Sequence, residues 1–266
     1  MLELDTCYIS ETGGRPRNED ACGYWQSDAT GCWVLSDGAG GHGSGDLASR
    51  LVVSTVLRRF KELPEVSCQH ALSLLKAAND AVIAEKTSGS TRDDMHATAA
   101  LLLLDRSCER AVLAHVGDSR IYHFRRAGLL SRTCDHSLVQ QMVDAGYGNA
   151  ELLRTHPKRN LLTSAIGAAG AIEMTVSPHP IEVSPGDCLL LCSDGWWEYL
   201  QDAEMELALS RTKAGVDWLD EMATTIRRRG KAGHDNYSAL CVSVRDELTV
   251  LLDPAKVMTL PFQPRE

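Results

Sequence analysis

The spacing of apolar residues changes along the chain, and each change predicts a new element. Residues 4–10 alternate apolar and polar side chains, which is typical of a half-buried strand. In residues 45–60 and 69–86 the apolar side chains recur every three or four positions, which predicts two amphipathic helices. Short apolar segments bounded by turn residues predict further strands at residues 21–26, 31–36, 96–104, 111–116, 120–125, 173–183, 188–192 and 237–244.

Helical spacing returns near the end of the chain, at residues 203–210 and 216–229. The order is therefore strands, two helices, many strands, two helices and a last strand. Because strands and helices do not alternate strictly, a doubly wound parallel sheet is disfavoured. We predict an α+β fold, a four-layer α/β/β/α sandwich in which helices lie outside two packed, mainly antiparallel sheets.

One internal segment does not follow these patterns. Residues 137–145 predict a short helix, and residues 146–160 are polar and irregular. We interpret residues 136–161 as a flap inserted at the surface. We expect a single catalytic domain at residues 1–247, followed by a loosely held, proline-containing C-terminal tail at residues 248–266.

The composition narrows the classes of function. The chain has 36 Asp and Glu against 27 Lys and Arg, so its formal net charge is −9. This charge disfavours non-specific nucleic-acid binding, which needs clustered basic residues, and suits a site that holds cations.

The cysteines and the apolar runs predict where the protein works. Nine cysteines without a C-x-x-C pair fit neither a disulfide framework nor a common zinc motif, which favours a reducing compartment. The start of the chain does not resemble a signal peptide, and the longest apolar run, residues 97–104, is too short to span a bilayer. We therefore expect a cytoplasmic protein with no membrane partner.

Four aspartates share one sequence context, beside a tight turn at the end of an apolar segment. They are Asp37, Asp118, Asp194 and Asp235, and each neighbours Gly or Asn. Clustered carboxylates repel one another unless a proton or a cation neutralises them. Because no His or Cys set accompanies them, their oxygen ligands favour Mg²⁺ or Mn²⁺ over Zn²⁺. Two such ions about 4 Å apart would activate a bridging water for in-line attack on phosphorus.

Simpler interpretations exist for each of these residues alone. Asp-Gly is common in turns, so a single aspartate would be a turn residue or a helix N-cap. Four of them, with Arg15 and the Glu19-Asp20 pair upstream, make a shared site the better interpretation. The glycine-rich stretch after Asp37 lacks the Gly-Lys-Ser/Thr of a P-loop and the βαβ setting of a dinucleotide site.

Several histidines and tryptophans have structural interpretations. His96, His115 and His123 lie in predicted strands and are expected to be structural rather than metal ligands. Trp196 and Trp197 are expected to pack a helix against the sheet.

Six short motifs follow one another along residues 4–244: Arg15-x-x-Asn18-Glu19-Asp20, Ser36-Asp37-Gly38-x-Gly40-Gly41-His42, Gly117-Asp118-Ser119-Arg120, Asp135-His136-Ser137, Ser193-Asp194-Gly195 and Asp235-Asn236-Tyr237-Ser238. Each motif alone is weakly specific, but all six in this order are strongly specific. With them the sequence resembles the metal-dependent Ser/Thr protein phosphatases of the protein phosphatase 2C type, of the bacterial kind.

The resemblance implies metal ligands at the matching positions. Asp37 would bridge two Mn²⁺ or Mg²⁺ ions, Gly38 would offer its backbone carbonyl, and Asp194 and Asp235 would complete the shell of one ion. Asp118, together with Asp194, would hold a third, weaker ion.

The resemblance also implies roles around the ions. Glu19, and with it Asp20, would bind or orient the second shell of waters around the ions. Arg15 would bind the substrate phosphate, a task that suits the planar guanidinium fork. The flap would lie beside the site and affect the choice of substrate.

One position departs from the family pattern. In eukaryotic relatives a histidine follows the Asp-Gly pair and is a candidate general acid, whereas this chain has Ala39. His42 is a candidate for that task, but a structural histidine that bonds the loop backbone is the preferred interpretation. A metal-bound water is a third source of the proton.

The implied function is hydrolysis of phosphoserine and phosphothreonine on proteins, by a water that bridges two divalent ions, reversing a bacterial Ser/Thr kinase. The expected partners are phosphorylated proteins and that kinase, and the chain is expected to be a monomer. The alternative is a catalytically inactive scaffold or sensor with the phosphatase fold; the complete set of acids favours the enzyme. A phosphatase that acts on a sigma-factor regulator is a narrower reading, which the lack of a visible sensor domain disfavours.

Overall fold

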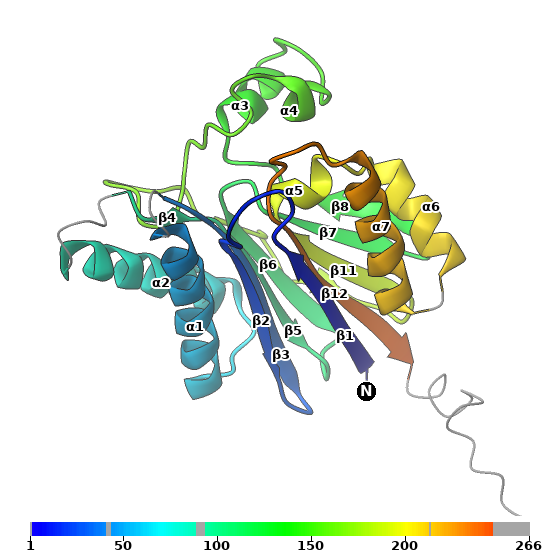
Figure 1. Cartoon of the computed structure of the whole chain (residues 1–266). Coiled ribbons are helices and arrows are strands. Elements are labelled where there is room, and N and C mark those ends of the chain that lie inside the picture. The colour runs from blue at the N-terminus through cyan, green and yellow to red at the C-terminus, as the bar shows by residue number, and fades with distance from the viewer. Residues whose placement is uncertain (1, 41–43, 89–93, 213, 247–266) are drawn as a thin grey trace, which may run out of the picture.

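Two sheets packed face to face form the centre of the protein. The computed structural model describes residues 2–40, 44–88, 94–212 and 214–246. Helices cover the outer faces of both sheets, so that the molecule has four layers (Figure 1). Between the described strands all pairings are antiparallel. The predicted α+β sandwich is confirmed.

The first sheet has five strands and contains both ends of the described fold. Its strands lie in the order β1 (Leu2–Glu11), β12 (Tyr237–Asp246), β11 (Asp187–Cys192), β7 (Arg120–Arg125) and β8 (Gly128–Arg132). The helices α6 (Asp202–Arg211) and α7 (Gly215–Arg229) cover its outer face (Figure 1).

The second sheet holds the remaining strands. Its main path is β10 (Ile181–Glu182), β6 (Arg110–Val116), β5 (Ala99–Asp105), β3 (Thr30–Ala39) and β2 (Asp20–Gln26). Two short strands extend it, β4 (His96–Ala97) beside β3 and β9 (Thr175–Val176) beside β6. The helices α1 (Ser44–Glu62) and α2 (Cys68–Ser88) cover its outer face.

The core explains the unbroken apolar runs of the central strands. Side chains such as Leu102, Leu189 and Leu240 fill the space between the sheets, while Leu101 and Leu190 face the helices. A strand with both faces buried is apolar at successive positions, which is why residues 99–104 do not alternate.

The flap lies at one end of the sandwich (Figure 1). It carries α3 (Leu138–Asp144) and α4 (Leu152–Thr155), close to the short helix α5 (Asp194–Trp197). The Ser137 hydroxyl caps α3 by accepting a hydrogen bond from the Gln140 N–H. The sequence predicted α3 but not α4 or α5, because helices of a single turn have too few apolar positions to show a period.

Other boundaries differ from the prediction for physical reasons. The strand expected at residues 173–183 is only two short strands, since Pro178 and Pro180 lack the N–H that a ladder needs. The strand expected to end before Asp37 continues to Ala39, because β4 pairs with Gly38 and Ala39. Asp37 therefore lies within a strand, and the prediction that it ends one is wrong. The edge strand β8 was missed. The expected C-terminal tail lies outside the described residues.

Asp187 connects the start of β11 to the neighbouring strand. Its carboxylate accepts hydrogen bonds from Arg125 Nε at 2.7 Å and His123 Nε2 at 2.8 Å, which confirms a structural role for His123. Burial acts to raise the pKa of Asp187, but the bonds from Arg125 and His123 outweigh it and lower the pKa to about 2. The ion pair between the Asp187 carboxylate and Arg125 therefore stabilises the folded state.

We predict that Asp187→Asn lowers the free energy of unfolding at pH 7 by on the order of 2 kcal/mol. The folded pKa lies below the unfolded value of 3.8, so this contribution is present above that value and disappears as the pH falls towards 2. Urea unfolding between pH 7 and pH 2 measures it. A gap between wild type and variant that stays constant over this range would contradict the assignment.

Candidate metal centre

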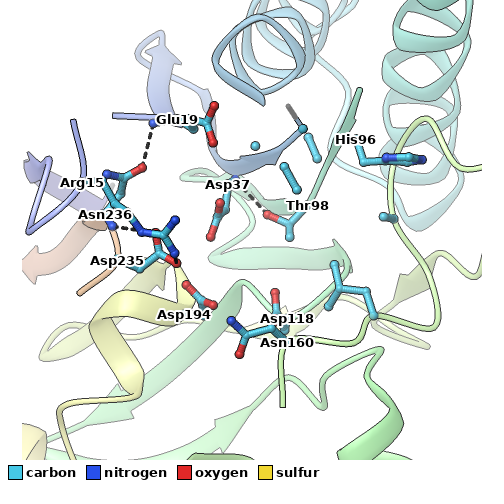
Figure 2. A pocket seen from close by; sticks show the side chains of 16 residues that line it. Arg15, Glu19, Asp37, His96, Thr98, Asp118, Asn160, Asp194, Asp235 and Asn236 are labelled. Atoms are coloured by element: carbon cyan, nitrogen blue, oxygen red, sulfur yellow. Dashed lines mark hydrogen bonds and ion pairs between the residues drawn. The ribbon is translucent and has the colours of Figure 1, made fainter. Parts of the chain in front are cut away.

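A cavity of about 300 Å³ opens at the end of the sandwich that carries α5. Figure 2 shows carboxylates from different parts of the chain around it. Asp37 lies in β3 and Glu19 directly precedes β2, both at the second sheet. Asp194 begins α5 directly after β11, and Asp235 lies just before β12, both at the end of the first sheet. Asp118 lies in the turn between β6 and β7 that joins the sheets. The predicted site residues that line the cavity are Arg15, Glu19, Asp37, Gly38, Asp118, Asp194 and Asp235.

Two predicted residues stand apart from this set. Asp20 does not line the cavity; it is buried behind Asp37 and accepts a hydrogen bond from the Ser193 hydroxyl at 2.8 Å. His42 lies outside the described residues.

Thr98 fixes the backbone of Asp37. The Thr98 Oγ1 accepts a hydrogen bond from the Asp37 N–H at 2.9 Å, and the Thr98 N–H donates to the Asp37 carbonyl at 2.8 Å. Thr98 also bonds the Ser119 hydroxyl at 2.7 Å, next to Asp118. No local pattern predicts this role, since Thr98 is one small residue within an apolar stretch.

Gly38 allows α1 to approach the strand. A Cβ at this position would lie 2.0 Å from the carbonyl oxygen of Gly45, and the Gly38 N–H donates to the Glu19 carbonyl at 3.1 Å. Any larger residue would push the first turn of α1 away from Asp37.

Asn236 joins three segments beside the site. Its Oδ1 accepts from the Glu19 N–H, and its Nδ2 donates to the carbonyls of Thr12 and Arg17, each at 2.8 Å. A Cβ on Gly195 would lie 2.0 Å from the Asn236 carbonyl, so the segment after Asp194 packs directly on the segment after Asp235. The sequence marked Asn236 as part of a motif but did not reveal that it connects these segments.

Arg15 lies at the mouth of the cavity with half of its side chain exposed. Its Nη2 lies 2.8 Å from Asp235 Oδ2 (Figure 2). An exposed ion pair of this kind is weak, so an incoming anion can take over the guanidinium.

The acids raise one another's pKa values. Burial is the main cause for Asp37 and Asp194, followed by repulsion from neighbouring aspartates, and both pKa values lie well above the usual value. Burial also raises the pKa of Asp20 to about 6 and of Asp118 to about 7. Asp20 and Asp37 face each other in the register of β2 and β3, where two like charges destabilise a sheet.

These acids fit hard divalent ions. The Oδ1 atoms of Asp20 and Asp194 are buried without a hydrogen-bond partner, as expected for oxygens that await a cation. No three His, Cys, Asp or Glu side chains within the described ranges are arranged as a complete metal site. Mg²⁺ and similar ions bind proteins through one or two carboxylates and keep several waters, so this looser arrangement suits them and does not suit zinc.

His96 faces the position where eukaryotic relatives have a histidine. It pairs with Ala39 in the register of β3 and β4 and lines the cavity at its edge (Figure 2). Its Nδ1 lies 3.0 Å from the Asp94 carbonyl, which only accepts, so Nε2 takes a hydrogen bond from Lys86 Nζ at 3.3 Å. Both ring nitrogens are engaged outside the acid cluster, which agrees with the predicted structural role.

The family of proteins that this chain resembles agrees with the metal site that the geometry indicates. Residues 12–239 match the family model of protein phosphatase 2C. The serine/threonine phosphatase Stp of Listeria innocua is 30% identical over 234 residues, which is 86% of this chain and 90% of that protein.

Solved structures share the fold. The catalytic domain of the serine/threonine phosphatase PstP, determined with two manganese ions, is 27% identical with a TM-score of 0.78, and the match covers 92% of this chain and 100% of that one. PppA of Pseudomonas aeruginosa, a regulatory component of a type VI secretion system, is 29% identical with a TM-score of 0.72 over 91% of this chain and 97% of that one.

We predict that Thr98→Val weakens Mn²⁺ binding and destabilises the protein by about 1–3 kcal/mol, because the Asp37 N–H loses its acceptor. The matched control is Thr133→Val, which removes a similar bond to the Ile121 N–H, 3.0 Å long, away from the acids. Calorimetric titration with Mn²⁺ and urea unfolding separate the two effects. Equal Mn²⁺ affinity in the two variants would show that Thr98 does not position Asp37 for metal binding.

Proposed function

The chain belongs to the protein phosphatase 2C family, and on this basis we propose that it removes phosphate from phosphoserine and phosphothreonine on proteins in a metal-dependent hydrolysis. One observation supports this most strongly. Buried carboxylates from both sheets meet at one cavity, two with an unpartnered oxygen at or behind it, and an arginine lies at its mouth. This combination suits a divalent-metal phosphatase and has no use in a purely structural turn.

Bound divalent ions would supply the central chemistry. Two bound Mn²⁺ or Mg²⁺ ions would neutralise the carboxylates and provide an activated water and a Lewis acid for attack at phosphorus. Asp37 lies between Glu19 and Asp194 (Figure 2) and is proposed to ligate both ions. Asp194 and Asp235 are proposed to complete one shell, and the Gly38 carbonyl to contribute to the other.

The surrounding residues have proposed roles that follow from their positions. Glu19 and Asp20 lie on the β2 side of Asp37 and would orient waters there. Repulsion from Asp118 helps to raise the pKa of Asp194, and the two carboxylates would hold a third, weaker ion. Arg15 would leave Asp235 to bind the phosphate through two parallel N–H groups.

The proton for the leaving oxygen has no donor among the described imidazoles that line the cavity. His96 is the imidazole found there, and both of its nitrogens are engaged elsewhere. Water around the ions is the source that this geometry favours, since the methyl group of Ala39, which lines the cavity, has no proton to donate. His42 remains a candidate in the sequence.

The flap supplies one wall of the cavity. Asn160, near the end of the flap, and Leu162, directly after it, line the cavity. Because these side chains lie beside the place where the phosphorylated residue enters, we propose that the flap affects which protein substrates are accepted.

We further propose that the chain is a cytoplasmic monomer whose substrates are proteins phosphorylated by a cognate Ser/Thr kinase. All nine cysteines are free thiols, which suits a reducing compartment. Helices already cover the outer faces of both sheets, which leaves no bare sheet face for a second copy. Among the described residues no helix is long and apolar enough to cross a membrane.

We predict that Asp37→Asn lowers Mn²⁺-dependent hydrolysis of a phosphothreonine peptide by at least about 100-fold, because one carboxylate serves both ions. Chelation of the metal should have the same effect on the wild type, and adding Mn²⁺ should reverse it. The variant and the chelated wild type are also assayed with an aryl phosphate as a second substrate. Activity that survives chelation and the substitution would contradict the metal mechanism, and a wild type inactive with metal bound would favour the scaffold alternative.

We predict that Arg15→Ala lowers kcat/KM by about 10- to 100-fold, mainly through KM, since it removes a charged phosphate contact. Arg15→Lys should recover only part of the loss, because an ammonium cannot bind two oxygens as a fork. The control is Arg17→Ala, an equally exposed arginine two residues away. Equal losses for Arg15→Ala and Arg17→Ala would indicate a general charge effect rather than a phosphate contact.

A further inference from the structure

Trp197 connects the two segments that carry Asp118 and Asp194. It lies in α5, three residues after Asp194, and is buried. Its indole Nε1–H donates a hydrogen bond to the backbone carbonyl of Asp118 at 2.9 Å. The Trp197 side chain therefore joins the helix that begins with Asp194 to the turn that contains Asp118.

A buried ion pair fixes the orientation of the indole. The guanidinium of Arg120 lies 3.5 Å from the centre of the Trp197 ring, a cation–π contact. Arg120 in turn makes two parallel hydrogen bonds to the carboxylate of Asp135, each 2.8 Å long, and both side chains are excluded from solvent. Because a buried pair is costly to break, Arg120 cannot shift and the ring beneath it is held.

The other side of the Asp118 turn is also held. The Gly117 N–H donates to His136 Nδ1 at 3.2 Å, and the His136 N–H donates to the Gly117 carbonyl at 2.9 Å. Gly117 has φ of 92°, which suits glycine, so the turn itself follows from the sequence. After Asp118, Thr98 bonds the Ser119 hydroxyl, and Trp197 bonds the Asp118 carbonyl itself.

The flap is tied to the same residue. Arg154 in α4 donates from Nε to the Trp197 carbonyl at 3.0 Å and from Nη2 to the Leu200 carbonyl at 3.1 Å. The position of α5, and with it the indole, thus depends on contacts with the flap.

We propose that Trp197 is a positioning residue for Asp118, and that its indole N–H keeps the Asp118 carboxylate facing Asp194 so that the two can hold a third, weaker divalent ion. This inference rests on the proposed function only in taking the Asp118 and Asp194 pair as a cation site. Asp118 has no other hydrogen bond to its backbone carbonyl among those described, so loss of the indole N–H would free the carboxylate to turn away.

The neighbouring tryptophan provides a matched control. Trp196 is equally buried in the same helix, but its Nε1 has no hydrogen-bond partner. Replacing either tryptophan by phenylalanine removes a similar volume from the same core, whereas only Trp197→Phe removes a bond to the acid cluster.

The test is Mn²⁺ binding to the metal-free protein, measured by electron paramagnetic resonance of the free ion and by calorimetry. We expect Trp197→Phe to lower the affinity for the weakest bound ion by about fivefold to tenfold, the effect of one hydrogen bond. The affinities for the tighter ions should stay within about twofold of wild type. Trp196→Phe should bind all ions as wild type does. Equal affinities in the two variants overturn the proposal, as does a wild type that binds no weaker ion.

A second measurement does not depend on the folding of Trp197→Phe. In wild-type protein labelled with ¹⁵N, the indole N–H resonance of Trp197 should move during the late part of a Mg²⁺ titration, while that of Trp196 should stay in place. A Trp197 resonance that stays in place up to saturation overturns the proposal. Neither measurement uses catalysis, so a negative result with an active wild type removes this inference alone, and an inactive wild type removes the proposed function alone.

Discussion

Repulsion between buried carboxylates is the constraint on which this structure depends. Asp20 and Asp37 face each other across two strands, and Asp118 and Asp194 approach the same cavity from the other side. In an interior of low polarity such a cluster costs free energy unless a cation or protons compensate it. The fold therefore has to hold these side chains together against their own repulsion while leaving their oxygens free for ligands.

The chain meets this requirement through the backbone. Thr98 bonds the peptide of Asp37 on both sides, Asn236 connects the segments around Glu19 and Asp235, and Trp197 holds the carbonyl of Asp118. None of these bonds uses a carboxylate oxygen of Asp37, Asp118 or Asp194. The strands β3, β6 and β11, which carry or lead to Asp37, Asp118 and Asp194, are buried on both faces, which makes them rigid enough to resist the repulsion.

The sequence predicted the layers and the acids because each has a local signal. Apolar periodicity marks α1 and α2, and the Asp-Gly and Gly-Asp pairs mark the acids. The contacts that arrange those acids join residues far apart in the chain, such as Thr98 with Asp37 and Trp197 with Asp118, and no local pattern reveals them. The continuation of β3 beyond Asp37 depends on its pairing with β4, and the local pattern that predicted a strand at residues 96–104 does not reveal which strand it pairs with. The roles of His42 and of the C-terminal tail stay predictions from the sequence.

Thermal unfolding of Asp37→Asn without and with metal tests whether the acids repel one another in the folded protein. If the acids repel one another in the metal-free protein, removing one charge relieves that repulsion. In chelator at pH 8 the variant should therefore unfold a few degrees above the wild type, which corresponds to a gain of about 1–2 kcal/mol in the free energy of unfolding. With saturating Mn²⁺ the order should reverse, because the wild type gains the binding free energy of ions that the variant cannot hold. A metal-free variant that unfolds below the metal-free wild type would contradict the account.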